Sequence, residues 1–127
     1  MIRHVRPHAI PRSEAPFSQV VLDDDFAYLS GLVAADFPEG RAELGDVAKE
    51  TLAVLSAIDK ILEEVGLDMG RIVRVDVHLL SLDDFDAMDA VYRGFFEDGS
   101  YPARTTTESS RLFGGSRVEI TCMARRL

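Results

Sequence analysis

A long amphipathic pattern in the middle of this chain restricts its fold more than any other feature. From about Asp46 to Val65, apolar residues recur at intervals of three and four, and Gly66 follows directly. This spacing places the apolar side chains on one side of a helix, and a glycine at this point is typical of a helix end. A helix with one apolar side has to bury it, so the rest of the chain must supply a surface that covers it.

Short β-prone runs on both sides of this helix predict that surface. Ser18–Leu22 and Phe26–Ser30 flank three consecutive aspartates, which is typical of a hairpin. After the helix, Val73–Leu79 alternates apolar with polar residues, as a strand with one buried face does. The last two runs, Arg104–Ser109 and Arg117–Met123, predict a second hairpin joined by a Gly-Gly turn.

A second helix is predicted between the third strand and the final hairpin. Ser81 and Asp84 have the spacing of a capping box, and an apolar stripe follows from Phe85 to Phe95. The order is therefore hairpin, helix, strand, helix, hairpin. It indicates an α+β fold in which two helices cover one face of a mixed β-sheet. No linker divides the 127 residues, so we expect a single domain over residues 1–127.

The third predicted strand has a second face that mixes apolar and charged side chains. Its members alternate along the strand: Ile72, Arg74, Asp76, His78 and Leu80. Such a face is unusual in solvent and reasonable at a contact between subunits. We therefore expect a homo-oligomer.

Charge and hydropathy narrow the possible partners. The formal net charge is −8, which opposes nucleic-acid binding because that binding depends on cations that neutralise phosphates. No apolar run approaches the roughly 18 residues of a membrane span. The first residues contain no apolar stretch typical of a secretory signal, so a cytoplasmic location is expected.

Residues that often carry chemistry are few. The single Cys122 alternates with apolar neighbours in its strand, which favours a packing role over a nucleophilic one. His4, His8 and His78 lack ligand spacing, so no metal site is expected.

Arg104 enters its predicted strand directly after Tyr101-Pro102-Ala103. Alternation places Arg104 and Thr106 on one face of that strand, and Glu119 on one face of the next. If the two faces coincide, a guanidinium that can hold a ligand carboxylate lies near a glutamate that can direct a water molecule. An ordinary cross-strand ion pair of Arg104 or Arg117 with Glu119 is the alternative, and spacing alone favours it.

Five short motifs together resemble the Rid family, the YjgF-type reactive-intermediate deaminases. They occur in the family's order over residues 16–125, which is nearly the whole chain. The motifs are Pro16-Phe17-Ser18-Gln19, Ser30-Gly31, Asp89-Ala90-Val91-Tyr92 leading to Phe95-Phe96, Pro102-Ala103-Arg104, and Val118-Glu119-Ile120 ending in Ala124.

The resemblance implies a chorismate-mutase-like fold assembled as a homotrimer, with sites in the clefts between subunits. It also implies hydrolysis of carboxylate-bearing enamines or imines, such as 2-aminoacrylate, to 2-oxo acids and ammonia, without metal or organic cofactor. By position, Arg104 matches the arginine that grips the substrate carboxylate, and Glu119 the glutamate associated with the attacking water. Ser30 and Gly31 match positions that line the pocket, and Thr106 stands where many members have a cysteine.

Three departures from the family pattern concern the substrate. Phe17 replaces a tyrosine, Leu32 a common glutamine, and Asp89 a common asparagine. If Asp89 reaches the pocket, its charge would repel a substrate carboxylate or attract a substrate amine. Our hypothesis is that these changes shift the preferred substrate away from the smallest 2-imino acids.

Two other functions are alternatives to imine hydrolysis. A non-catalytic metabolite sensor or protein-interaction subunit would use the same Arg104 cleft, and loss of the tyrosine hydroxyl at Phe17 keeps this alternative open. Ribonuclease activity is disfavoured by the acidic net charge and by the lack of a paired His/Lys arrangement.

Overall fold

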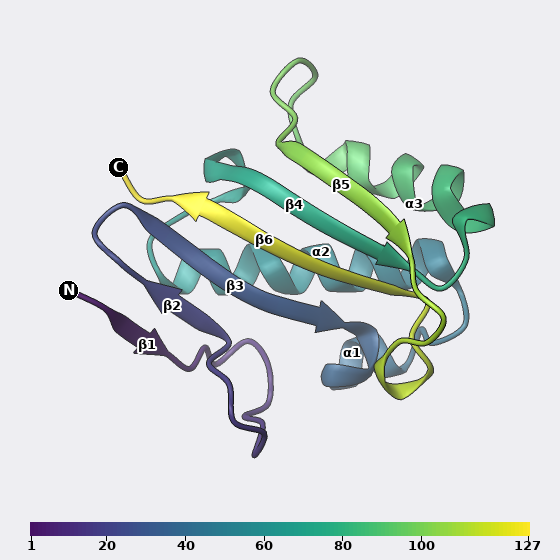
Figure 1. The fold of residues 1–127 in the computed structure, drawn as a ribbon, viewed down its shortest axis with the longest axis horizontal. Coiled ribbons are helices and arrows are strands. Elements are labelled where there is room, and N and C mark those ends of the chain that lie inside the picture. Colours follow the sequence, from purple (N-terminus) through teal and green to yellow (C-terminus); the bar gives the residue numbers. More distant parts are fainter.

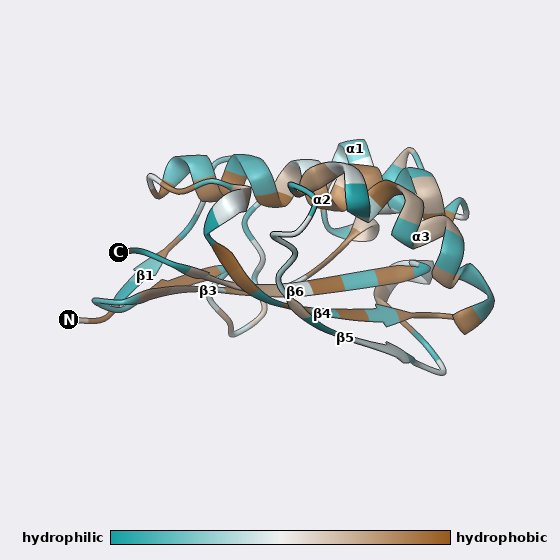
Figure 2. Ribbon diagram, turned by 90° about the horizontal axis from the view of Figure 1, so that it is seen from above, coloured by the Kyte–Doolittle hydropathy of each residue, from teal (hydrophilic) through white to brown (hydrophobic).

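The computed structural model describes all 127 residues. The chain forms one six-stranded mixed sheet with helices on one face (Figures 1 and 2). The strand order is β1-β2-β3-β6-β4-β5, and only β4 and β5 are parallel. The strands are β1 Arg3–Val5, β2 Val20–Leu22, β3 Phe26–Val33, β4 Ile72–Leu79, β5 Ala103–Glu108 and β6 Val118–Arg125. The helices are α1 Pro38–Arg41, α2 Val47–Glu64 and α3 Phe85–Tyr92. The predicted α+β class and first hairpin, β2 to β3, are confirmed.

The predicted central helix is α2, and its limits have clear local causes. The Asp46 side chain caps its first turn by accepting a hydrogen bond from the Lys49 amide at 3.1 Å. Gly66 has a φ of 78°, a conformation that favours glycine, and it ends the helical path. The apolar side of α2 is fully buried against the sheet (Figure 2). Each of its large aliphatic side chains contributes roughly 1.5–3 kcal/mol by leaving water.

The second helix differs from its prediction at both ends. The Ser81 hydroxyl accepts a hydrogen bond from the Asp83 amide at 3.1 Å, but it caps a 3₁₀ turn that precedes α3. Asp84 binds the Arg117 guanidinium at 2.7 Å. The predicted capping box between Ser81 and Asp84 was therefore wrong. The regular helix ends at Tyr92, and a further 3₁₀ turn continues to Phe95.

The predicted final hairpin was also wrong, because β5 and β6 are separated by β4. Their connection passes the end of β4, where the Ser109 amide donates to the Leu79 carbonyl and the Leu80 amide to the Arg117 carbonyl. The physical reason is burial. Every second residue of β6 is buried, which suits a central strand, whereas the polar sequence of β5 is tolerated at an edge (Figure 1).

The two faces of the sheet have different environments. Val75, Val77 and Leu79 of β4 point toward the helices and are buried. A register shift near the start of β4 buries Ile72 and leaves Val73 39% exposed, so the prediction that Val73 faces the core was wrong. No helix covers the opposite face, which we call the open face (Figure 2). Arg74, Asp76 and His78 of β4 lie there, partly exposed.

Cys122 lies in the core of β6, as its alternation predicts, and burial raises the pKa of its thiol to about 12. The thiol is therefore protonated at pH 8, and the thiolate is the reactive form. We expect the native protein to resist a disulfide reagent such as dithionitrobenzoate, and to react at once when unfolded in guanidinium. A Ser13→Cys variant, with an exposed thiol, is the positive control. Rapid modification of native wild type would contradict burial of Cys122.

Candidate functional site

Arg104 lies on the helix-covered face of the sheet, in its edge strand. It stands opposite Val75 in the parallel pairing of β5 with β4, so its side chain points to the same face as buried Val75. From there the guanidinium reaches α3. Its Nη1 atom donates to Oδ1 of Asp89 at 2.7 Å, and the two side chains are only 20% and 21% exposed. Asp89 therefore reaches the candidate site directly.

Two aromatic rings fix the position of the guanidinium. The central carbon of the Arg104 guanidinium lies 4.7 Å from the ring centroid of Tyr92 and 5.4 Å from that of Phe85. Cation–π contacts of this kind contribute roughly 0.5–2 kcal/mol. Besides the bond to Asp89, the Arg104 side chain makes no hydrogen bond within the chain. Its remaining N–H groups are thus available to a ligand.

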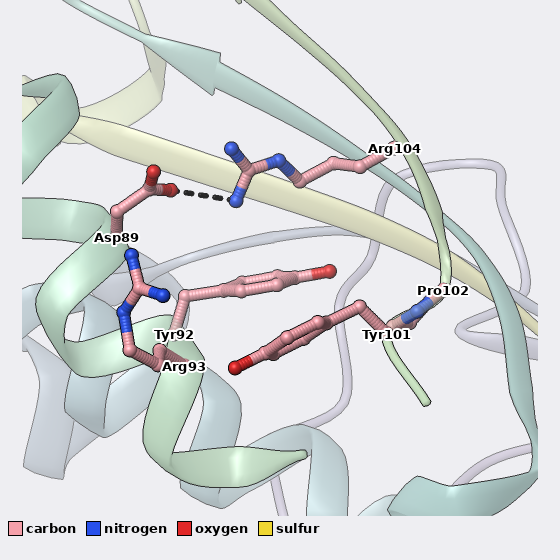
Figure 3. A pocket seen from close by; sticks show the side chains of 6 residues that line it. All are labelled: Asp89, Tyr92, Arg93, Tyr101, Pro102 and Arg104. Carbon is pink, nitrogen blue, oxygen red and sulfur yellow. Dashed lines mark hydrogen bonds and ion pairs between the residues drawn. The ribbon is translucent and has the colours of Figure 1, made fainter. Parts of the chain in front are cut away.

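A pocket of about 200 Å³ opens beside this ion pair (Figure 3). Figure 3 shows the ring of Tyr92 next to the Arg104 guanidinium, the ring of Tyr101 beyond that of Tyr92, and the Arg93 side chain beside Asp89. The lining residues are Asp89, Tyr92, Arg93, Tyr101, Pro102 and Arg104. Sequence reasoning missed Tyr92, Arg93 and Tyr101 as site residues. Helical spacing three and four residues beyond Asp89 is the signal that indicates the first two.

Tyr92 lines this pocket and is almost completely buried. Its hydroxyl oxygen is buried without a hydrogen-bond partner in the chain. Burial raises the pKa of Tyr92 to about 12, against the opposing effect of the Arg104 charge. The phenol therefore stays protonated at neutral pH.

Glu119 lies in a second hollow, on the open face. Glu119 stands opposite His78 in the antiparallel pairing of β6 with β4. Because His78 lies on the open face, Glu119 points to that face as well. A hollow of about 420 Å³ is lined by Glu119 together with Phe17 and Gly31. Gly31 leaves room for the Glu119 carboxylate, because a Cβ atom at this position would overlap that carboxylate and force it to move.

The structure does not bring Arg104 and Glu119 together within one chain. β4 separates their strands, and the two side chains point to opposite faces of the sheet. The condition that the faces of Arg104 and Glu119 coincide is therefore not met within a single chain. The alternative prediction of a cross-strand ion pair was wrong, because Arg104 pairs with Asp89 and Arg117 with Asp84.

The other predicted residues are distributed over both regions. The Ser30 hydroxyl donates to the Ser18 carbonyl at 2.7 Å and thereby fastens the segment before β2 to β3. Thr106 faces the helices, like Arg104, but does not line the Arg104 pocket. Leu32 is buried in the core, so it does not face either hollow.

Two findings concern other kinds of site. No three His, Cys, Asp or Glu side chains are grouped as ligands for a metal ion. None of the helices combines the length and the apolar character needed to cross a membrane.

Comparison with known families identifies the chain. The family model described as endoribonuclease L-PSP matches residues 7–126. This chain belongs to that family, the YjgF-type or Rid family. The predicted family membership is thereby confirmed.

Named relatives of this Rid protein include deaminases. Proteins from goat and human called 2-iminobutanoate/2-iminopropanoate deaminase are 36% and 33% identical to it over 114 residues, covering 90% of this chain and 82% of each relative. A crystal structure of a putative endoribonuclease from Thermotoga maritima has a TM-score of 0.89 at 29% identity, with 98% of both chains covered. A Rid-family protein of unknown function from Yersinia pestis has a TM-score of 0.88 at 25% identity, with 98% of this chain and 99% of that chain covered.

The departures of this Rid chain from the family pattern have different structural meanings. Phe17 lies on the rim of the Glu119 hollow, 51% exposed, and offers no hydroxyl there. Asp89 binds Arg104 and lines its pocket. Leu32 belongs to the core. Only Phe17 and Asp89 can therefore alter ligand contacts directly.

The unpartnered hydroxyl of Tyr92 leads to a stability prediction. An unsatisfied buried polar group costs about 1–3 kcal/mol, so Tyr92→Phe should leave the free energy of unfolding unchanged or raise it by about 1 kcal/mol. Tyr92→Ala, which also removes the ring under Arg104, should lower it by about 3–5 kcal/mol. Urea denaturation measures both variants. A loss above about 1 kcal/mol for Tyr92→Phe would show that the hydroxyl has a stabilising partner.

Proposed function

We propose that this protein hydrolyses 2-imino acids, or the enamines that tautomerise to them, to 2-oxo acids and ammonia. The observation that carries the proposal is Arg104, a partly buried guanidinium with unoccupied N–H groups at the edge of a pocket. Such a group holds a carboxylate in a defined plane. The deaminase names of relatives at 33–36% identity support the same reaction.

In the proposed reaction, one water molecule replaces the imine nitrogen. The water oxygen attacks the imine carbon, and Glu119 accepts a proton from that water. Glu119 passes this proton to the nitrogen, which gives a neutral carbinolamine. The carbinolamine hydroxyl then gives up its proton to the nitrogen through Glu119 as the carbon–nitrogen bond breaks, and the nitrogen leaves as ammonia. An imine is already electrophilic, so positioning of the carboxylate and of the water supplies most of the catalysis. The reaction consumes one water and needs neither metal nor organic cofactor.

The two halves of the proposed site come from different copies of the chain. One copy supplies Arg104 with Asp89 and Thr106, and its neighbour supplies Glu119 with Phe17, Ser30 and Gly31. The separation of Arg104 and Glu119 within one chain supports this arrangement, as does the uncovered open face with its charged residues. A homotrimer with three such clefts satisfies it, because each subunit then offers one half-site to each neighbour.

A non-catalytic carboxylate sensor is the second candidate, favoured by one observation. Phe17 offers no hydroxyl to a water at the Glu119 hollow. A sensor would bind a 2-oxo acid at Arg104 without turnover. The endoribonuclease names of the family and of some relatives suggest RNA cleavage instead, but a net charge of −8 opposes binding to phosphates.

Replacing Arg104 tests the proposed reaction. Imines are generated from amino acids by an amino-acid oxidase, and their loss is followed by semicarbazone formation. Arg104→Ala removes the carboxylate anchor and leaves Asp89 without its partner, so kcat/KM should fall by about 10²–10³-fold. Arg3→Ala, which removes an exposed arginine of β1, should retain activity. Absence of hydrolysis by wild type, with binding of a 2-oxo acid preserved, would favour the sensor.

Mixing two inactive variants tests whether the site lies between copies. Arg104→Ala and Glu119→Gln are refolded together in equal amounts. If each site takes one residue from each of two neighbours, random assembly restores about a quarter of the wild-type activity. Each variant refolded alone is the control. A mixture as inactive as its components would place the site within one chain and contradict the proposed arrangement.

A further inference from the structure

Asp89 changes what the Arg104 pocket can bind. Its Oδ1 atom already occupies Nη1 of the guanidinium at 2.7 Å. A ligand carboxylate on the remaining N–H groups of Arg104 would therefore lie next to a second carboxylate. Two anions at this distance repel each other unless a hydrogen-bond donor lies between them.

The second oxygen of Asp89 makes no hydrogen bond within the chain. A carboxylate oxygen can only accept hydrogen bonds, whereas an asparagine amide can also donate them. In an imino or amino acid, the carbon beside the carboxylate bears a nitrogen with at least one N–H group. In a 2-oxo acid, the same carbon bears an oxygen without hydrogen, which also only accepts.

We propose that Asp89 is a specificity-determining residue, an inference that rests on the proposed function. It selects ligands with an N–H group on the carbon next to their carboxylate. An imine, especially in its protonated form, donates to the free oxygen of Asp89 while its carboxylate binds Arg104. The 2-oxo acid product places an acceptor against an acceptor and is rejected. The pocket thereby distinguishes the substrate of the reaction from its product by hydrogen-bond pattern.

The other lining groups do not make this distinction. Arg93 lines the pocket, is exposed and forms no ion pair, so its charge attracts the carboxylate of either ligand. Tyr92 and Tyr101 present rings that contact both ligands in the same way. Asp89 is the one carboxylate among the lining residues.

Two ligands with the same carbon skeleton test the proposal: 2-oxobutanoate and L-2-aminobutanoate. Their dissociation constants are measured by calorimetry at pH 7 for wild type and Asp89→Asn. Wild type should bind the amino acid more tightly. Asp89→Asn should shift the ratio of the two constants about tenfold or more toward the oxo acid, the change that one gained and one lost hydrogen bond produce.

Asp86→Asn is the matched control, because it removes the same charge from an exposed position of α3 and should leave the ratio unchanged. A shift below about twofold in Asp89→Asn, or equal changes for both ligands, overturns the proposal. If Asp89→Asn does not fold, the ratio of the two dissociation constants in wild type tests the proposal. Wild type that binds the oxo acid as tightly as the amino acid, or more tightly, overturns the proposal. Imine hydrolysis by wild type and its loss in Arg104→Ala are scored separately, so failure of the proposed function is recognised independently.

Discussion

The burial of β6 in the middle of the sheet determines where the chemistry can lie. Val118, Ile120, Cys122 and Ala124 are all buried beneath the helices, so β6 needs a strand on each side. β3 and β4 fill those places and leave β5 at the edge. Arg104 is thereby placed at the rim of the helix-covered face, and Glu119, between two buried residues of β6, on the open face. One requirement for apolar burial thus separates the two groups that the proposed reaction needs.

A buried carboxylate connects this sheet to the helices. Glu50 of α2 is fully buried and accepts hydrogen bonds from the amides of Gly45 and Arg117, each at 2.8 Å. It ties the start of α2 to the residue that precedes β6. The Arg117 side chain in turn binds Asp84 just before α3, at 2.7 Å. Because α3 carries Asp89, this chain of polar contacts helps to position the partner of Arg104, and each charge that it buries is paired or hydrogen-bonded.

Local patterns predicted the elements well and their neighbours poorly. Periodicity located α2, and alternation located β6, because each pattern is set by burial of one side of one element. Strand adjacency depends instead on competition between strands for the central positions. The polar residues of β5 contain that information, since a strand such as Ala103–Glu108 gains little from a central place. The hairpin prediction rests on the Gly114-Gly115 turn and does not weigh this polarity.

The sequence likewise indicates residues of the candidate site better than it indicates their contacts. Arg104, Glu119 and Gly31 follow from the motifs, and the contact of Gly31 with Glu119 gives a physical reason for the glycine. The partner of Arg104 did not follow from spacing, because Asp89 lies on α3, which contacts β5 only in the folded chain. Phe17 and Ser30 were named by resemblance, and the structure adds that the Ser30 hydroxyl is engaged by the backbone at Ser18.

The Asp89–Arg104 pair also sets the range over which the proposed site would recognise a carboxylate ligand. A lone guanidinium would attract anions over the Debye length of about 8 Å, against the repulsion of the remaining acidic surface. Paired at 2.7 Å, Asp89 and Arg104 act at longer range as a dipole whose field falls off steeply. Recognition then depends on contact, where unoccupied N–H groups and a free carboxylate oxygen present donors and an acceptor side by side. In the proposed site, the charges of Arg93 and Arg104 would attract the ligand carboxylate, and the order of donors and acceptors beside Asp89 would select among the ligands that carry one.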